Sequence, residues 1–147
     1  MVGRFKYSFT QERIMDDEIS RIREKRIQEL KDRMKHAVKA EISVVDEMHF
    51  QEFIKTHQFV VLDFWAEWCA PCRRVGLVLE ELSKEFSGKV TFGKCNTEEN
   101  RVLAMNFNIT AIPSIMLFSH GQLVDRIIGA YPKEALREKI VRKFHLK

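Results

Sequence analysis

Cysteine is scarce in this chain, with three residues among 147. Three cysteines can form at most one disulfide, which leaves one thiol unpaired, so this is not a small fold held together by several disulfides. No apolar run approaches the ~20 residues that a membrane-spanning helix needs. The first ten residues, MVGRFKYSFT, have neither the apolar stretch nor the cleavage site of a secretory signal. We therefore expect a cytoplasmic protein without membrane contact. In that reducing compartment a Cys-x-x-Cys pair is more often catalytic or metal-binding than structural.

A large charge of one sign is also missing. Lys and Arg number 25 against 21 Asp and Glu, a net charge of +4. The two signs are interleaved, with no dense basic block and no regular alternation of aromatic and basic residues. This pattern disfavours nucleic acid as a partner. Hydrophobic residues make up 45 % of the chain, enough for one globular core.

The N-terminal segment, residues 1–41, is densely charged and has no Gly or Pro between Thr10 and Lys39. We expect one long helix over this stretch, roughly eight turns at 3.6 residues each. A narrow apolar stripe runs along it. Its members are Met15, Ile19, Ile22, Leu30, Met34 and Ala37. The segment is either a solvated extension or an element that pairs with a second copy or recruits a partner; we favour the second interpretation.

Residues 42–147 alternate between strand-like and helix-like patterns. Strands are expected at 41–45, 59–66, 89–95, 114–119 and 122–128, the last two joined by a tight His120-Gly121 turn. Helices are expected at 46–57, from the CxxC to about 86, at 98–106 and at 132–145. The order β-α-β-α-β-α-β-β-α predicts an α/β domain, with a mixed sheet and helices on both faces.

The stretch LDFWAEWCAPCRR, residues 62–74, carries the chemistry. Cys69 stands at the predicted start of a helix, where unpaired N–H groups stabilise a thiolate. We expect Cys69, and not Cys72, to be exposed at this position. Cys72 follows one turn later, and Pro71 suits the first helical turn. The alternative is half of a structural zinc site. Such a site needs four ligands, and no second CxxC or paired-histidine spacing is present, so we expect no metal.

Two motifs carry a family resemblance. VLDFWAEWCAPCRR resembles the active-site stretch of thioredoxins, and AIPSIMLFSHGQLVDRIIGA resembles their later loop and closing hairpin. The resemblance spans roughly Val44 to Phe144 and implies the thioredoxin fold, preceded by the long helix. It also implies a dithiol–disulfide oxidoreductase that reduces disulfides of client proteins. Its electrons would come from a thioredoxin reductase, and no cofactor would be bound.

The resemblance further implies roles for single residues. Cys69 and Cys72 would form the redox-active disulfide, and Asp63 would be a buried acid that takes the proton of Cys72 through water. Lys94 would lie near that acid, and Ile112-Pro113 would be a cis bond facing the cysteines. The residues expected to form an apolar substrate-binding rim are Trp68, Ala111, Ile112, Pro113, Gly129 and Ala130.

Blander alternatives stay open for three of these positions. Asp63 could be an ordinary hydrogen-bonded aspartate, Lys94 a solvated strand residue and Trp68 a core residue. Cys95, at a strand end, is most simply a buried inert thiol, with a regulatory or resolving role as the alternative.

The chain also departs from the family pattern. Ala70 stands where a glycine is usual between the cysteines, and Gly76 stands where many relatives have a kinking proline. The helix ISRIREKRIQELKDRM resembles the one that precedes this fold in phosducin-like adaptor proteins, which makes a binding or chaperone-adaptor role the alternative function. Those adaptors generally lack the paired cysteines, so WCAPC favours the enzyme. A glutaredoxin-type protein ranks below both, since no glutathione-binding motif is evident.

Overall fold

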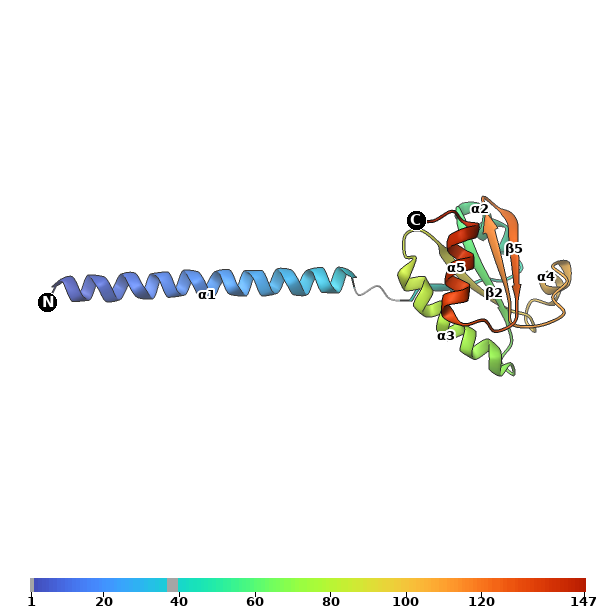
Figure 1. Cartoon of the computed structure of the whole chain (residues 1–147), viewed down its shortest axis with the longest axis horizontal. Helices are drawn as coiled ribbons and strands as arrows, with labels where there is room; N and C mark the ends of the chain where they lie inside the picture. Colours follow the sequence, from blue (N-terminus) through green and yellow to red (C-terminus); the bar gives the residue numbers. More distant parts are fainter. Residues whose placement is uncertain (1, 37–39) are drawn as a thin grey trace. The chain divides into compact units, whose positions relative to one another are not determined.

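The computed structural model describes the backbone of residues 2–36 and 40–147 and the side chains of residues 12–33 and 40–147. The chain divides into two compact units, one formed by helix α1 and one containing all the other helices and strands (Figure 1). The division into a helical extension, residues 1–41, and a thioredoxin-like domain, residues 42–147, stays a prediction.

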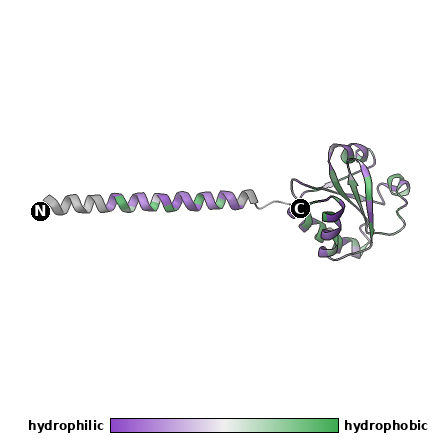
Figure 2. Cartoon of the chain, turned by 45° about the horizontal axis from the view of Figure 1, so that its top comes forward, coloured by the Kyte–Doolittle hydropathy of each residue, from purple (hydrophilic) through white to green (hydrophobic). Residues whose placement is uncertain are grey.

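Helix α1 spans Val2–His36. It begins eight residues before Thr10, so the expected start was wrong. No proline precedes Thr10, and once a helix exists each added residue gains a hydrogen bond at little cost, so the helix continues through this position. The described part of α1 is mostly hydrophilic with scattered hydrophobic residues (Figure 2). Met34 and Ala37, two members of the expected stripe, lie outside the side chains described. Among the helices described, none is both long and apolar enough to cross a bilayer.

The second unit is built on a five-stranded mixed sheet of order β1-β3-β2-β4-β5. The strands are β1 (Ile42–Val44), β2 (Phe59–Trp65), β3 (Thr91–Asn96), β4 (Ser114–Ser119) and β5 (Gln122–Ile128). Strands β1, β3 and β2 run parallel, whereas β4 pairs antiparallel with both β2 and β5. The thioredoxin fold expected from the sequence is confirmed. Strand β2 lies at the centre of the sheet, so the CxxC that follows it leaves from the middle of the domain.

Four helices cover the two faces of the sheet. They are α2 (Phe50–Thr56), α3 (Ala70–Glu85), α4 (Arg101–Asn106) and α5 (Lys133–Lys143). Helices α3 and α5 pack on one face, around Val61 of β2, and lie side by side in Figure 1. Helices α2 and α4 pack on the other face, around Val60 and Leu62. Successive residues of a strand point to opposite faces, so Asp63 points to the α3 face, as Val61 does.

Two helices start later than expected, α2 at Phe50 and α4 at Arg101. Before α2, the Asp46 side chain accepts a hydrogen bond of 2.8 Å from the backbone N–H of His49. Before α4, the Asn96 side chain accepts one of 2.8 Å from the N–H of Glu98. Short Asx side chains that bond the backbone ahead of them hold a turn, which delays the helix.

Candidate redox site

Cys69 and Cys72 stand at the junction between β2 and α3. Cys69 caps helix α3: its backbone is extended, and its Sγ accepts a hydrogen bond of 3.2 Å from the N–H of Cys72. Pro71 lies in the first turn, where no N–H is needed. The two cysteines are joined in a disulfide with their Cα atoms 5.3 Å apart. Helix α3 runs without interruption through Gly76.

Both cysteines are covered. We expected only Cys69 to be exposed at the helix start, but it is 4 % exposed and Cys72 is 2 % exposed. The expectation was wrong for this disulfide-bonded form. Ala66 is buried with the two cysteines, and Trp65 and Ile112 pack against them. What distinguishes the two sulfurs is therefore their position on the helix, not their exposure.

The loop before β4 faces the cysteines. The Ile112-Pro113 bond is cis, as the resemblance implied. The carbonyl oxygen of Ile112 lies 3.9 Å from Sγ of Cys69. Gly129, at a φ of 106° that favours glycine, donates a backbone hydrogen bond of 2.9 Å to the carbonyl of Pro113. This bond ties the loop after β5 to the loop that faces the sulfur.

A groove of about 320 Å³ lies beside this loop. Its lining residues are Trp68, Thr97, Ile109, Thr110, Ala111 and Ile112. Three of the six expected rim residues therefore line one groove. Pro113 is buried, and Gly129 and Ala130 do not line the groove. The sequence reasoning missed Thr97, Ile109 and Thr110, because no motif marks them and only the fold brings them here.

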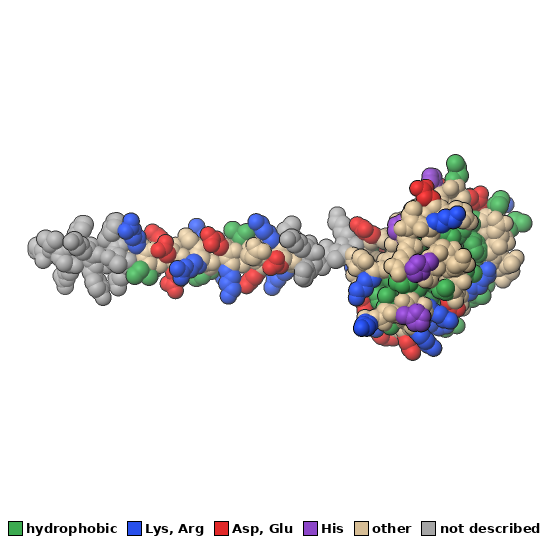
Figure 3. Space-filling view, turned by 90° about the horizontal axis from the view of Figure 1, so that it is seen from above, with side chains coloured by type: hydrophobic (Ala, Val, Ile, Leu, Met, Phe, Trp, Pro, Cys, Tyr) green, Lys and Arg blue, Asp and Glu red, His purple; other side chains and the backbone are tan. Residues whose placement is uncertain are grey.

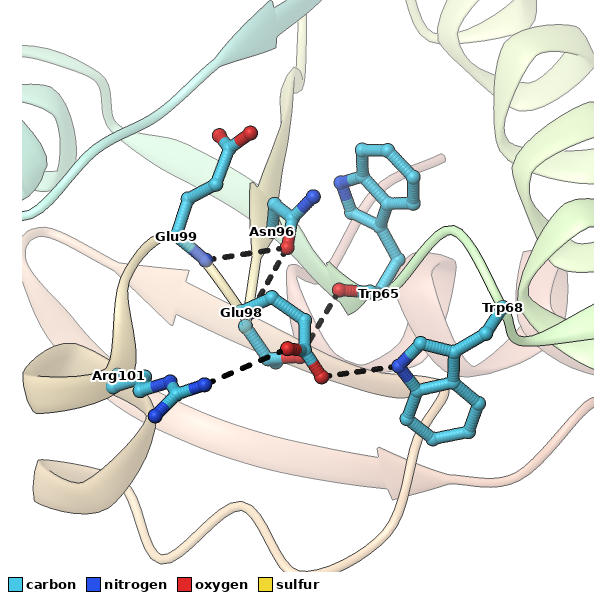
Figure 4. A network of polar contacts seen from close by, with 7 residues as sticks. Trp65, Trp68, Asn96, Glu98, Glu99 and Arg101 are labelled. Carbon is cyan, nitrogen blue, oxygen red and sulfur yellow. Dashed lines mark hydrogen bonds and ion pairs between the residues drawn. The ribbon is translucent and has the colours of Figure 1, made fainter.

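Trp68 forms one wall of the groove and is 69 % exposed, which rules out the core alternative. Its indole Nε1 donates a hydrogen bond of 3.0 Å to Oε1 of Glu98. The other carboxylate oxygen of Glu98 lies 3.8 Å from a guanidinium nitrogen of Arg101 (Figure 4). Asn96 supports the same loop by accepting from the N–H groups of Glu98 and Glu99. The sequence reasoning missed this network, although the Asn96 turn could have indicated a loop held in place.

Asp63 lies on β2, is 4 % exposed and points into a cavity of about 180 Å³. Among the residues described, its Oδ1 has no hydrogen-bond partner. Burial raises the pKa of Asp63 to about 7, and the charge of Lys94 on the neighbouring strand opposes the rise. Lys94 is half-buried, lines the same cavity, and its Nζ lies 5.4 Å from the centre of the Trp65 ring. The cavity has room for several water molecules.

Gly76 also lines this cavity, one helical turn after Cys72. A buried carboxyl that titrates near neutrality and shares a roomy cavity with the active-site helix has the properties of a general base.

The third thiol, Cys95, is fully buried on the opposite face of the sheet, in the α2/α4 core. Burial raises the pKa of Cys95 to about 12, with nearby acidic side chains adding to the rise. Such a thiol stays protonated and unreactive. Within the part of the chain that the structure describes, no three His, Cys, Asp or Glu side chains gather as a metal site would require.

A cysteine pair bridged across the first turn of a helix and facing a cis-proline loop defines a dithiol–disulfide exchange site. Comparison with known proteins agrees. The family model for thioredoxin matches residues 41–142. Thioredoxin 1 of Nostoc sp. is 40 % identical over 101 residues, which cover 69 % of this chain and 94 % of that protein. The chloroplastic M-type thioredoxin of Spinacia oleracea is also 40 % identical over 101 residues, covering 68 % of this chain and 56 % of the relative.

A solved structure is similar as well. A mutant thioredoxin from Halobacterium salinarum superposes with a TM-score of 0.68 at 26 % identity, covering 76 % of this chain and 97 % of that one. The chain belongs to the thioredoxin family, and it carries that family's redox-active cysteine pair as Cys69 and Cys72.

Proposed function

We propose that this protein reduces disulfides of client proteins through Cys69 and Cys72. The thiolate of Cys69 attacks one client sulfur, forms a mixed disulfide and releases the other client sulfur as a thiolate. Cys72 then gives its proton to Asp63 through water and attacks Sγ of Cys69. The bond to the client breaks, its second sulfur leaves as a thiolate, and Cys69–Cys72 becomes a disulfide. Two electrons pass from the enzyme's dithiol to the client disulfide.

The observation that carries this proposal is the capping position of Cys69. The N–H of Cys72 points at the Cys69 sulfur from 3.2 Å. A donor at that place, together with the helix dipole, favours the thiolate form that attacks. Cys72 lies within the first turn of α3, with its Cα 5.3 Å from that of Cys69, so it is suited to attacking the mixed disulfide that Cys69 forms with a client.

The groove beside Cys69 supports a protein client. Trp68, Ala111 and Ile112 offer an apolar surface to an extended segment, and the backbone of Ile112 could pair with that segment as an added strand. Pro113 and Gly129 shape the loop that presents Ile112, through the cis bond and the Gly129–Pro113 hydrogen bond. Ala130, which is exposed, stays proposed as part of the apolar rim. Lys94 is proposed as an auxiliary group that moderates the pKa of Asp63.

The enzyme would be returned to its dithiol form by a thioredoxin reductase and would need no bound cofactor. We propose a cytoplasmic location on the low cysteine content. We also propose that α1 adds a means of association, either with a second copy or with a partner. The adaptor alternative would use the same fold without turnover.

The deciding experiment is reduction of a protein disulfide by the purified full-length chain with dithiothreitol as the electron source. We expect turnover well above the rate with dithiothreitol alone, and none with Cys69→Ser. Cys95→Ala, which removes the third thiol, is the matched control and should keep wild-type turnover. A wild-type chain without turnover would favour the adaptor.

A further inference from the structure

Helix α1 exposes an apolar stripe that its own unit leaves unpaired. The stripe residues described are Met15, Ile19, Ile22 and Leu30, each between 44 % and 61 % exposed. Their spacings of four, three and eight residues keep them on one side of a helix. Exposed helices of this kind usually gain their stability by packing the apolar side against something else.

A recess interrupts the stripe near its C-terminal end. It measures about 190 Å³ and is lined by Arg26, Glu29, Leu30 and Arg33. Their positions are i, i+3, i+4 and i+7, the four residues that form a hole for a side chain of a facing helix in coiled coils. Two of the four are arginines, so the side chain that enters should have acidic neighbours.

The distribution of charge along α1 favours a second α1 helix, in antiparallel orientation, as the partner of the stripe. Figure 3 shows both signs along the described part of the helix, but residues 12–22 carry four acids and two bases, whereas residues 23–33 carry three acids and five bases. Asp16, Asp17 and Glu18 lie in the first half, and Lys25, Arg26, Lys31 and Arg33 lie in the second. A parallel pair of α1 helices would place Arg26 and Arg33 against the same arginines. An antiparallel pair would place the basic half of each helix against the acidic half of the other.

We propose that two copies of this chain associate through α1 in antiparallel orientation, with the two-fold axis between Ile22 and Arg23. Residue n of one helix then faces residue 45 − n of the other. Met15 of one copy faces Leu30 of the other and enters the recess. Glu12 faces Arg33, and Glu18 lies beside Arg26. The same register places Asp16 opposite Glu29, so the two halves match in net charge and not at every pair. The redox chemistry does not depend on this pairing.

In this interface the apolar contacts determine the affinity and the charges determine the orientation. Exposed ion pairs add little affinity, so the stripe residues supply most of the binding. Charges instead choose orientation, because like charges placed face to face are strongly disfavoured. The C-terminal ends of the two α1 helices come to lie at opposite ends of the pair. The second unit of each copy follows from its own helix at that end.

Association is tested by light scattering and sedimentation of the full-length chain in dithiothreitol, which removes intermolecular disulfides. We expect a concentration-dependent dimer. Arg26→Glu combined with Arg33→Glu should weaken it at least about tenfold, because acids would then face acids. The matched control, Arg21→Glu with Lys31→Glu, makes the same charge change on the opposite side of α1 and should leave the dimer intact. Circular dichroism checks that both variants keep the helix.

Orientation is tested with spin labels on single cysteines at Ser20 or Lys31 in a Cys69→Ser, Cys72→Ser chain, where buried Cys95 does not react. Antiparallel pairing separates the two Lys31 labels by about 17 residues along the axis, roughly 25 Å, and the two Ser20 labels by only roughly 7 Å. Parallel pairing gives equal distances at both positions. Equal distances, a monomer at high micromolar concentration, or a dimer that tolerates glutamate at 26 and 33 would each overturn the proposal.

Discussion

The indole N–H of Trp68 donates to the carboxylate of Glu98, 30 residues further along the chain, at 3.0 Å. This bond joins the residue before Cys69 to the loop that leads into α4. The wall of the groove is thereby held in place before any client arrives, which lowers the ordering cost of binding.

Replacing Glu98 should loosen that wall. For Glu98→Ala we expect the KM for a protein disulfide to rise roughly fivefold, the equivalent of one hydrogen bond of about 1 kcal/mol, with kcat little changed. The indole N–H resonance of Trp68 should shift at the same time. Glu99→Ala, next in the chain, is the control because only its backbone joins the network. An unchanged KM would show that the groove wall orders itself without Glu98.

The two cysteines should respond differently to substitution. Cys72→Ser should accumulate a covalent complex with a client through Cys69, because the attacking thiol is present and the resolving thiol is absent. Cys69→Ser should form none. Non-reducing electrophoresis after mixing with a disulfide-bonded client separates the cases. A complex that forms with Cys69→Ser instead would reverse the two roles.

Asp63 should reduce stability at alkaline pH. Its folded pKa of about 7 lies above the ordinary value of 3.8, so the folded state binds a proton more tightly than the unfolded state. The carboxylate therefore costs stability as pH rises above about 4, and the penalty levels off once pH passes about 7. A shift of this size corresponds to at most roughly 4 kcal/mol.

Asp63→Asn should remove this penalty. We expect the variant to gain up to a few kcal/mol over wild type at pH 8 and to lose most of the gain near pH 4, where Asp63 is protonated in the folded state and about half protonated in the unfolded state. Denaturant melts at the two pH values measure the difference. Turnover at pH 8 should fall in the same variant, because Cys72 loses its base. A less stable Asn variant at pH 8 would contradict a buried acid with a raised pKa.

Cys95 should be chemically unreactive in the folded protein. With the pKa of its thiol raised to about 12 and no exposed surface, it should not react with a thiol reagent at pH 8. The reduced native chain should therefore titrate at most two thiols, and the denatured chain three. A third thiol that reacts in the native state would favour the alternative in which Cys95 has a regulatory or resolving role.

Removal of residues 1–40 should separate the two parts of the molecule. We expect the remaining chain to reduce a small disulfide at nearly the wild-type rate and to be monomeric by light scattering. A large loss of activity with the fold intact would mean that α1 takes part in catalysis. Unfolding on deletion would place the domain boundary earlier than residue 42.

Local patterns in the sequence were sufficient for several elements. Strands β4 and β5 begin and end at the residues expected, because the turn between them is short and chemically specific. His120 and Gly121 adopt positive φ values of 52° and 77°, as a two-residue hairpin turn of this kind requires. The start of α3 follows from similar local rules, since Pro71 in a first turn indicates where a helix begins.

Only the tertiary structure decided the surroundings of these elements. The burial of Cys69 depends on Ile112, which is 43 residues away in the chain. The raised pKa of Asp63 depends on how closely α3 and β3 cover it, and the placement of Trp68 depends on Glu98. Local propensity governs where an element begins and ends. Burial, electrostatics and side-chain hydrogen bonds depend instead on residues that are close only after the sheet has formed, and no pattern within one segment encodes them.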